Sequence, residues 1–159
     1  MIAILADIRS SHNVGSIFRT ADAAGVEKLY LCGVTPEVRD RYGRANEKLL
    51  KVALGAEKTI AWEHVKSAVR LADSLKKDGF EILALEQSRG ATTLFDARPK
   101  NFSKTALIVG NEIRGLSRTL LKRADRIIQI PMYGKKESLN VAVAFGIAAY
   151  QLRAKIKKQ

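Results

Sequence analysis

The chain has 159 residues, enough for one domain with a sizeable core, and its 28 Lys and Arg residues against 16 Asp and Glu give a formal charge of +12. This excess favours a polyanionic partner, either nucleic acid or an anionic membrane surface. A single cysteine, Cys32, excludes an intramolecular disulfide, and we interpret it as a small core residue. The two histidines lie far apart, so we expect no metal. No signal peptide or membrane-spanning run is found, and we expect a cytoplasmic protein.

The N-terminal part of the chain reads as a β-α-β unit. An apolar run over residues 2–7 predicts a strand, and apolar residues at helical spacing predict a helix over residues 13–24. Asn13 is a plausible N-cap of this helix and Gly25 a plausible C-cap. A second strand follows at residues 28–34. This order implies parallel strands joined by a right-handed crossover.

The alternation of strands and helices continues to the C-terminus. The further strands are expected at residues 58–62, 80–87, 105–110 and 126–131. The further helices are expected at residues 46–54, 65–77, just after Ser117, and 138–149, with a helical turn inside the loop 88–103. Six strands separated by helices predict an α/β fold with an open, mostly parallel sheet, in a single domain over residues 1–159.

The last predicted helix is apolar on nearly every side after its opening residues Ser138, Leu139 and Asn140. A surface helix keeps a polar face, so this helix should be buried all round, either in its own domain or against a second copy. Ser138 fits the N-cap position of this helix.

Ligands of open parallel sheets bind beyond the carboxyl ends of the strands, and polar residues gather in the loops there. The residues that stand out are Asn13, Arg19, Glu112, Ser138 and Asn140. The sequence has no dinucleotide-binding glycine motif, no P-loop and no hydrolase nucleophile elbow. These loops therefore indicate a site that positions the reacting groups of its ligands and does not use a covalent nucleophile.

Three segments carry a family resemblance: "NVGSIFRTADAAG", "LIVGNEIRGLS" and "IPMYGKKESLNVAVAFGIAA". They resemble the three ordered motifs of the SpoU-type, or TrmH-like, RNA ribose 2'-O-methyltransferases of the SPOUT superfamily. The resemblance implies an α/β domain with a C-terminal trefoil knot. It also implies S-adenosylmethionine (S-adenosyl-L-methionine) as cofactor, bound in the knotted loops, and a homodimer with the last helix in its interface.

The same resemblance implies roles for individual residues. The catalytic set is Asn13, Arg19, Glu112, Ser138 and Asn140. The cofactor-binding set is Leu85, Gly110, Ile130, Met132, Ser138 and Leu139. Two features depart from the commonest pattern of the family. Ile113-Arg114 stands where a small residue often follows the glutamate, and no added RNA-binding domain is recognised.

The proposed chemistry is methyl transfer to a ribose 2'-hydroxyl of tRNA or rRNA. A guanidinium is effectively always protonated, so we expect Arg19 to clamp the neighbouring phosphate and lower the pKa of the hydroxyl electrostatically. His12 is the alternative proton acceptor, or else a loop residue that contacts RNA or solvent. The basic residues expected to contact RNA are Arg9, Arg39, Arg41, Arg44 and Lys135.

Two other functions stay open at this point. The chain could be a non-catalytic RNA-binding or assembly module of the same fold, although the complete set of motif residues argues against lost turnover. It could also methylate a small molecule, which fits the strong positive charge poorly.

Overall fold

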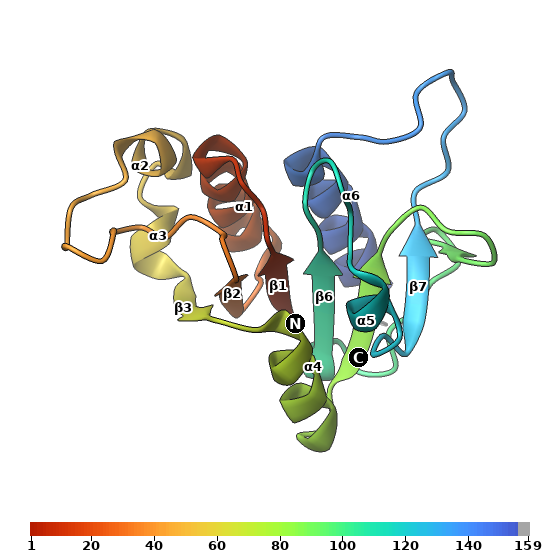
Figure 1. Ribbon diagram of the computed structural model, residues 1–159. Coiled ribbons are helices and arrows are strands. Elements are labelled where there is room, and N and C mark those ends of the chain that lie inside the picture. The colour runs from red at the N-terminus through yellow and green to blue at the C-terminus, as the bar shows by residue number, and fades with distance from the viewer. Residues whose placement is uncertain (156–159) are drawn as a thin grey trace.

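Seven parallel strands form one open sheet in the computed structural model, which describes residues 1–155 (Figure 1). Their order in the sheet is β3-β2-β1-β6-β4-β7-β5. The strands are β1 (Ile2–Ala6), β2 (Lys28–Cys32), β3 (Ala61–Val65), β4 (Glu81–Leu85), β5 (Thr92–Thr93), β6 (Thr105–Val109) and β7 (Arg126–Gln129). β1 and β6 pair at the centre and every residue of both is buried, as expected for parallel strands covered on both faces.

Helices cover both faces of the sheet. They are α1 (Ser11–Ala24), α2 (Glu47–Ala53), α3 (Ala56–Thr59), α4 (Ala68–Lys77), the 3₁₀ helix η1 (Phe102–Lys104), α5 (Arg118–Leu121) and α6 (Val141–Ala154). One hydrophobic cluster joins α1, α2, α3 and α6 to the sheet, and a second cluster joins α4 and α5 to its other face. Because side chains alternate along a strand, Ala3 and Leu5 enter the first cluster while Ile2 and Ile4 enter the second.

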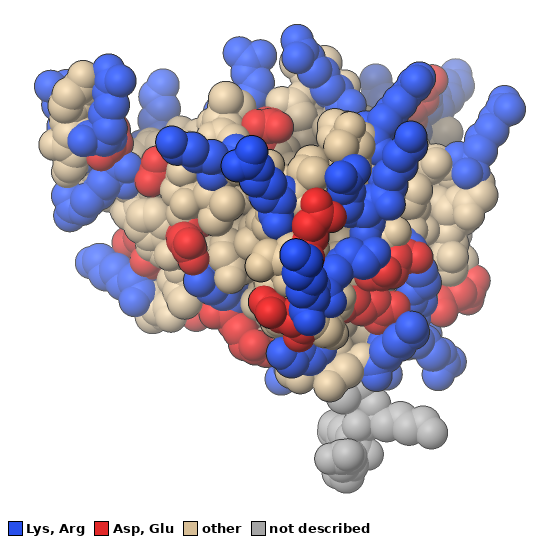
Figure 2. All heavy atoms as spheres, turned by 60° about the horizontal axis from the view of Figure 1, so that its bottom comes forward, with Lys and Arg blue, Asp and Glu red and all other residues tan. Residues whose placement is uncertain are grey.

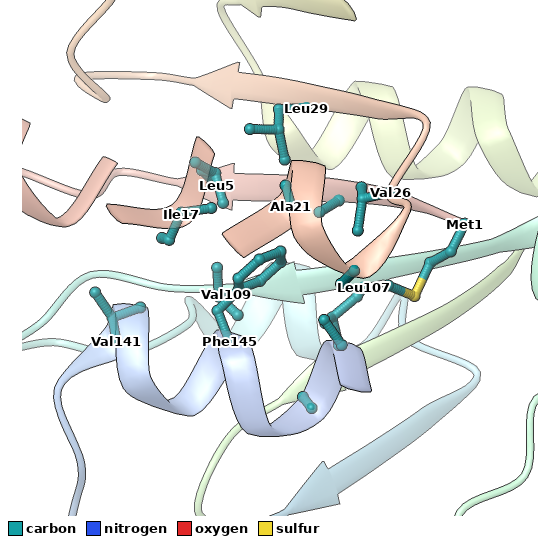
Figure 3. Close-up of a cluster of buried hydrophobic side chains, with 14 of the residues drawn as sticks. Met1, Leu5, Ile17, Ala21, Val26, Leu29, Leu107, Val109, Val141 and Phe145 are labelled. Atoms are coloured by element: carbon teal, nitrogen blue, oxygen red, sulfur yellow. The ribbon is translucent and has the colours of Figure 1, made fainter. Parts of the chain in front are cut away.

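The first cluster fixes α1 and α6 side by side over the centre of the sheet. Figure 3 shows Ile17 of α1 and Phe145 of α6 meeting Leu5 and Val109 from the two central strands. All four side chains are at most 2% exposed, and burying a side chain of this size stabilises the fold by about 1.5–3 kcal/mol. The packing therefore brings the start of α1 and the start of α6 to the same edge of the sheet.

The structure confirms the α/β class, the parallel sheet and most elements, and it corrects several boundaries. The helix predicted to begin at residue 65 begins at Ala68, because Ser67 is its N-cap. The strand predicted at residues 58–62 is β3, Ala61–Val65, whose mixed polarity suits the edge of a sheet. The short strand β5 was not predicted, since two threonines give no periodic signal. Cys32 is buried as expected, and this burial, then the nearby Asp7 and Glu63, raises the pKa of its thiol to about 12.

Two predicted N-caps are wrong. Ser10 caps α1 by accepting a hydrogen bond from the Asn13 N–H, so Asn13 lies inside the first turn. Asn140, not Ser138, caps α6, because its Oδ1 accepts the N–H groups of Ala142 and Val143. Neighbouring hydroxyl and amide side chains are all competent caps, and only the path of the loop selects one of them.

The last helix is not buried all round within one chain. Phe145, Ala148 and Leu152 are buried, but Val143 and Tyr150 are each 52% exposed. The chain's own domain thus leaves part of this apolar surface to solvent, and burial against a second copy stays a prediction. The trefoil knot also stays a prediction. Within residues 1–155, no helix has both the length and the apolar character needed to cross a membrane.

The contact of α1 with α2 allows a direct test of this packing. A Cβ at Gly15 would lie 2.5 Å from the Leu49 carbonyl oxygen, which belongs to the backbone and cannot swing aside. We expect Gly15→Ala to lower the free energy of unfolding by about 1–3 kcal/mol through overpacking. Urea unfolding measures this change. Gly134→Ala is the matched control, since a Cβ there meets nothing within 4 Å. Equal stability of the two variants would contradict the close approach of α1 and α2.

Candidate active site

A half-open cleft lies at the carboxyl ends of β4, β6 and β7, where the start of α6 closes one side. Its cavity volume is about 180 Å³, and it opens to solvent at its mouth. All residues of the predicted cofactor set line it: Leu85, Gly110, Ile130, Met132, Ser138 and Leu139. Tertiary folding therefore gathers on one cleft a set that spans 55 positions of the sequence, from residue 85 to residue 139.

Three of the predicted catalytic residues form a continuous hydrogen-bonded chain beside this cleft. The Asn13 Nδ2 donates to Glu112 Oε1 at 3.0 Å, and the Asn140 Nδ2 donates to Asn13 Oδ1 at 3.1 Å. Amide groups can donate and accept at once, so Asn13 links a carboxylate on one side to an amide on the other. Each of the three motif segments contributes one of these residues, so the hydrogen bonds join the three segments.

Glu112 also binds the turn that opens α1. Its carboxylate accepts the backbone N–H groups of Arg9 at 3.1 Å and Ser10 at 3.2 Å. Partial burial raises the pKa of Glu112, but the hydrogen bonds from Arg9, Asn13 and Ser10 outweigh it and hold the pKa below its ordinary value. A negative charge beside the start of a helix is also favoured by the helix dipole. Glu112 is thus a fixed carboxylate at the mouth of the cleft.

The loop that carries Glu112 is itself tightly held. Asn111 donates from Nδ2 to the Asp7 carbonyl at 2.7 Å, and its Oδ1 accepts the N–H groups of Ile113 and Arg114, both at 3.0 Å. At Gly110, a Cβ would come within 2.8 Å of the Gly115 backbone, so only glycine allows these two backbone segments to approach this closely. This geometry places the Glu112 carboxylate on the α1 side of the cleft. Ile113, one of the residues that departs from the family pattern, is 83% exposed and lines the mouth.

Glu86 and Gln87 line the same cleft, although they are not among the site residues predicted from the sequence. The Glu86 carboxylate accepts the Leu116 N–H at 2.7 Å and the Gln87 N–H at 3.0 Å, and the Gln87 Nε2 donates to the Ile130 carbonyl at 2.7 Å. These contacts tie the loop after β4 to those after β6 and β7. In the sequence, the only sign of their role is that two polar residues directly follow a buried strand. Such a pair does not indicate which residues it will bind.

Arg19 lies elsewhere. It is six residues after Asn13, which places it about 120° around a helix of 3.6 residues per turn. Its exposed side chain borders a second hollow, together with Ser16, Val52 of α2 and Tyr150 of α6. Within one chain, the structure therefore brings Asn13, Glu112, Ser138 and Asn140 together and leaves Arg19 outside.

The remaining predicted residues are on the surface. His12 and Arg9 are exposed beside the start of α1, and neither lines the cleft. Lys135 is exposed in the loop before α6. Arg39, Arg41 and Arg44 lie in the loop between β2 and α2, at the left edge of Figure 1, where Figure 2 shows Lys and Arg side chains around a projection of the surface. Over residues 1–155, no three His, Cys, Asp or Glu side chains gather as metal ligands would.

The lowered pKa of Glu112 gives a prediction for pH dependence. A carboxylate whose pKa is lower in the folded state stabilises the fold above its unfolded pKa of about 4.3, and this contribution is lost as the pH falls through the folded pKa. We expect Glu112→Gln to lower the melting temperature at pH 7 and to flatten its decline between about pH 5 and pH 3.

Thermal melts across this range measure the effect, with Glu137→Gln in the exposed loop before α6 as the control. Part of the acid sensitivity should persist, because Asp125 also has a lowered pKa: hydrogen bonds from Ile82 N–H and Lys76 outweigh its partial burial. If the melting temperature of Glu112→Gln falls with pH as steeply as that of the unchanged protein, the Glu112 carboxylate does not have this stabilising role.

Comparison with known proteins places this geometry in a family. Residues 1–150 match the profile of the SpoU rRNA Methylase family. A tRNA (guanosine(18)-2'-O)-methyltransferase of Aquifex aeolicus is 34% identical over 152 residues, which are 95% of this chain and 67% of that protein. A 23S rRNA (guanosine-2'-O-)-methyltransferase of Neisseria meningitidis is 32% identical over 153 residues, covering 96% of this chain and 58% of that protein. The chain thus spans about three fifths to two thirds of the length of these two relatives.

Solved structures agree with this placement. The SpoU methyltransferase AviRb from Streptomyces viridochromogenes, in complex with the cofactor AdoMet, superposes with a TM-score of 0.83 at 26% identity, over 97% of this chain and 59% of that one. A structure that concerns 2-OH methylation of C/U34 on tRNA superposes with a TM-score of 0.80 at 28% identity, over 96% of this chain and 93% of that one. With three motif segments meeting at one cleft and a profile match over nearly its whole length, the chain belongs to the SpoU rRNA methylase family.

Proposed function

We propose that the chain is an S-adenosylmethionine-dependent methyltransferase that acts on a ribose 2'-hydroxyl of tRNA or rRNA. The observation that carries this proposal is the hydrogen-bonded chain Glu112–Asn13–Asn140 beside a cleft lined by the predicted cofactor set. Relatives named as 2'-O-methyltransferases of tRNA and of rRNA support the reaction and the two substrate classes. The cytoplasm, where these RNAs work, is the compartment in which we expect the protein.

The cleft suits the cofactor chemically. Leu85, Ile130 and Leu139 supply apolar walls for an adenine ring, and the Glu86 and Glu112 carboxylates supply negative charge near a ligand that carries a sulfonium and an ammonium group. When bound, S-adenosylmethionine supplies an activated methyl group on its sulfonium. Residues of the chain would hold it through backbone groups of the three loops and through these walls, with Met132 and Ser138 beside them.

Catalysis then depends on how the chain's residues place the ribose. Transfer of the methyl group to the 2'-oxygen would leave S-adenosylhomocysteine and a proton that passes to solvent, and the chain's residues would hold the hydroxyl in position for this transfer. Orientation of this kind can supply several kcal/mol of the barrier, on the order of 7–11 in model systems. Ser138 lines the cleft and Asn140 starts α6 at its rim, so both can orient the hydroxyl. A guanidinium that clamps the adjacent phosphate would stabilise the charge developing on the oxygen.

We infer that this guanidinium is Arg19 of a second copy, in a homodimer. Arg19 and Tyr150 border the same hollow outside the cleft. Val143 is also exposed and precedes Tyr150 by about two helical turns, on the same face of α6. In a two-fold dimer the same region meets itself, so an α1–α6 interface would bury Val143 and Tyr150 and could carry each Arg19 toward the partner's cleft. This arrangement accounts for the one predicted catalytic residue that folding leaves outside the site.

The direct test of the function is methyl transfer from labelled S-adenosylmethionine to total RNA taken from cells that lack the gene. Mass mapping of ribose methylation then identifies the nucleotide and separates tRNA from rRNA. Calorimetry of the same preparation measures cofactor binding. Cofactor binding without transfer to any RNA fraction would favour the non-catalytic RNA-binding module, and the absence of both would overturn the proposal.

We expect Arg19→Ala to abolish methyl transfer while thermal stability and cofactor binding survive, because its side chain is exposed and lies outside the cleft. Arg19→Lys should rescue poorly, since an ammonium cannot reproduce a bidentate fork. Single-turnover transfer measures both. The assignment to the second copy predicts that mixing Arg19→Ala with Asn140→Ala protomers restores one intact site per mixed dimer. Near-normal transfer by Arg19→Ala alone would refute its role, and no restoration on mixing would place it in its own chain's site.

The dimer itself is tested by a charge in the proposed interface. We expect Val143→Asp to convert the protein to a 17.5 kDa monomer in light scattering, because a carboxylate is costly to bury in an apolar contact. Val34→Asp is the matched control: Val34 is 68% exposed, compared with 52% for Val143, and lies in the loop after β2, away from α6. A monomeric unchanged protein, or a Val143→Asp variant that still dimerises, would exclude this interface.

A further inference from the structure

The loop between β2 and α2 carries a short, rigid turn over residues 39–45. The Asp40 Oδ1 accepts the N–H groups of Tyr42 at 2.8 Å and Arg44 at 2.9 Å, and the Asp40 and Gly43 N–H groups donate to backbone carbonyls across the turn. Arg39 and Ala45 pair as an antiparallel bridge at its base. An Asp side chain that binds backbone groups ahead of it fixes a turn locally. The 39–45 turn therefore holds its tip in place without support from the core.

The tip presents an aromatic ring surrounded by guanidinium groups. Tyr42 is 67% exposed, and the guanidinium carbons of Arg41 and Arg44 lie 4.8 and 5.4 Å from the centre of its ring. Arg39 stiffens the same tip by donating from Nη1 to the Gly43 carbonyl at 3.0 Å. Single exposed aromatics are common on protein surfaces. What distinguishes this one is that a fixed turn offers a large π surface and several cations at the same point.

Side chains of both charge signs lie around the Tyr42 ring. The ring borders a shallow hollow that lies between the 39–45 turn and the end of β3, and Glu37, Asp40 and His64 also line it. The His64 ring is held there, because its Nε2 lies 3.0 Å from the Gly33 carbonyl and so donates to it. The Glu37 carboxylate in the hollow can accept hydrogen bonds from the amino groups of a neutral base, and Arg39 and Arg41 line the same hollow. The guanidinium groups at the tip suit the phosphates of the same strand.

We propose that the 39–45 turn is a binding site for an unpaired RNA nucleobase, which stacks on Tyr42 while Arg41 and Arg44 contact the flanking phosphates. The proposal rests on the proposed function, because it takes RNA as the substrate, and it goes further by naming the structural class of RNA that is bound. A base inside a duplex is stacked and paired, so its face is not available to Tyr42. The turn thus selects RNA with a single-stranded loop, bulge or end.

The guanidinium groups now over the ring do not block this site. A cation–π contact at an exposed position is weak, whereas stacking of a base on an aromatic side chain is stronger. An arriving base can therefore displace a guanidinium from the ring face, and the released guanidinium can turn to a phosphate. The number of favourable contacts rises in this exchange, and the fixed turn loses little conformational freedom.

Within one chain, the nucleotide bound here differs from a nucleotide methylated at the cleft of that same chain. In Figure 1 the loop that contains the 39–45 turn forms the left edge of the molecule, while the loops after β7 and β4 that border the cleft lie on the right. The turn therefore acts as a second point of contact that positions the RNA. Its loss should weaken RNA binding without changing the cofactor cleft.

The test uses Tyr42→Ala, Tyr42→Phe and the double variant Arg41→Gln/Arg44→Gln. The probes are a fluorescent single-stranded oligoribonucleotide of mixed sequence and the same strand annealed into a duplex, with anisotropy measured at matched salt. We expect Tyr42→Ala to lower affinity for the single strand roughly 5- to 100-fold, as lost base stacking does, and to leave duplex affinity unchanged. Tyr42→Phe keeps the ring and should retain most of the affinity. The double Arg variant should weaken both probes and reduce the salt slope by about 1–2.

Two further measurements keep the outcomes separate. Thermal melting and S-adenosylmethionine calorimetry on Tyr42→Ala should match the unchanged protein, which excludes a folding defect. A 2-aminopurine base in the single strand should lose fluorescence on binding to the unchanged protein and not to Tyr42→Ala, as a newly stacked base does. Equal loss of affinity for single strand and duplex, or no loss for either, would overturn the stacking site. Failure of methyl transfer with intact stacking would overturn only the proposed function.

Discussion

The hydrogen-bonded chain from Glu112 through Asn13 to Asn140 is the constraint on which the site depends. Its links join residues 99 and 127 positions apart in the sequence, so no local preference could form it. The hydrophobic packing of α1 against α6 brings the starts of both helices to one edge of the sheet. The hydrogen bond between Asn13 and Asn140 then holds the two helix starts together. Because Glu112 also holds the turn before α1, a shift of any of the three loops disturbs the other two.

Helix capping and function are combined in the same residues. Ser10 caps α1, which leaves the Asn13 side chain free to link Glu112 and Asn140. Asn140 caps α6 with its oxygen and uses its amide nitrogen for the chain. A purely structural interpretation of either asparagine is therefore incomplete. The two groups of an amide allow one residue to complete a helix and to align a neighbouring motif.

Charge on this molecule is divided by location. Carboxylates sit at the cleft, where Glu86 and Glu112 are held by backbone N–H groups, and exposed arginines lie in the loop between β2 and α2. A cationic small molecule and a polyanion can thus bind the same protein at separate places without competing. Arg19 follows the same division, since its exposed side chain does not line the cleft of its own chain.

The sequence by itself determined the class of the fold, the order of its main elements, the apolar faces and the residues that carry the family resemblance. These features follow from periodicity and from short motifs, which are local properties. Tertiary structure decided which competing side chain caps each helix, that Glu86 and Gln87 join the cleft, that β5 extends the sheet, and that Arg19 lies outside the cleft of its own chain. The reason is physical: a hydrogen-bond partner or a shared cleft depends on how distant segments pack. Neighbouring residues show which face of a helix Arg19 occupies, but they do not show which distant loop that face meets.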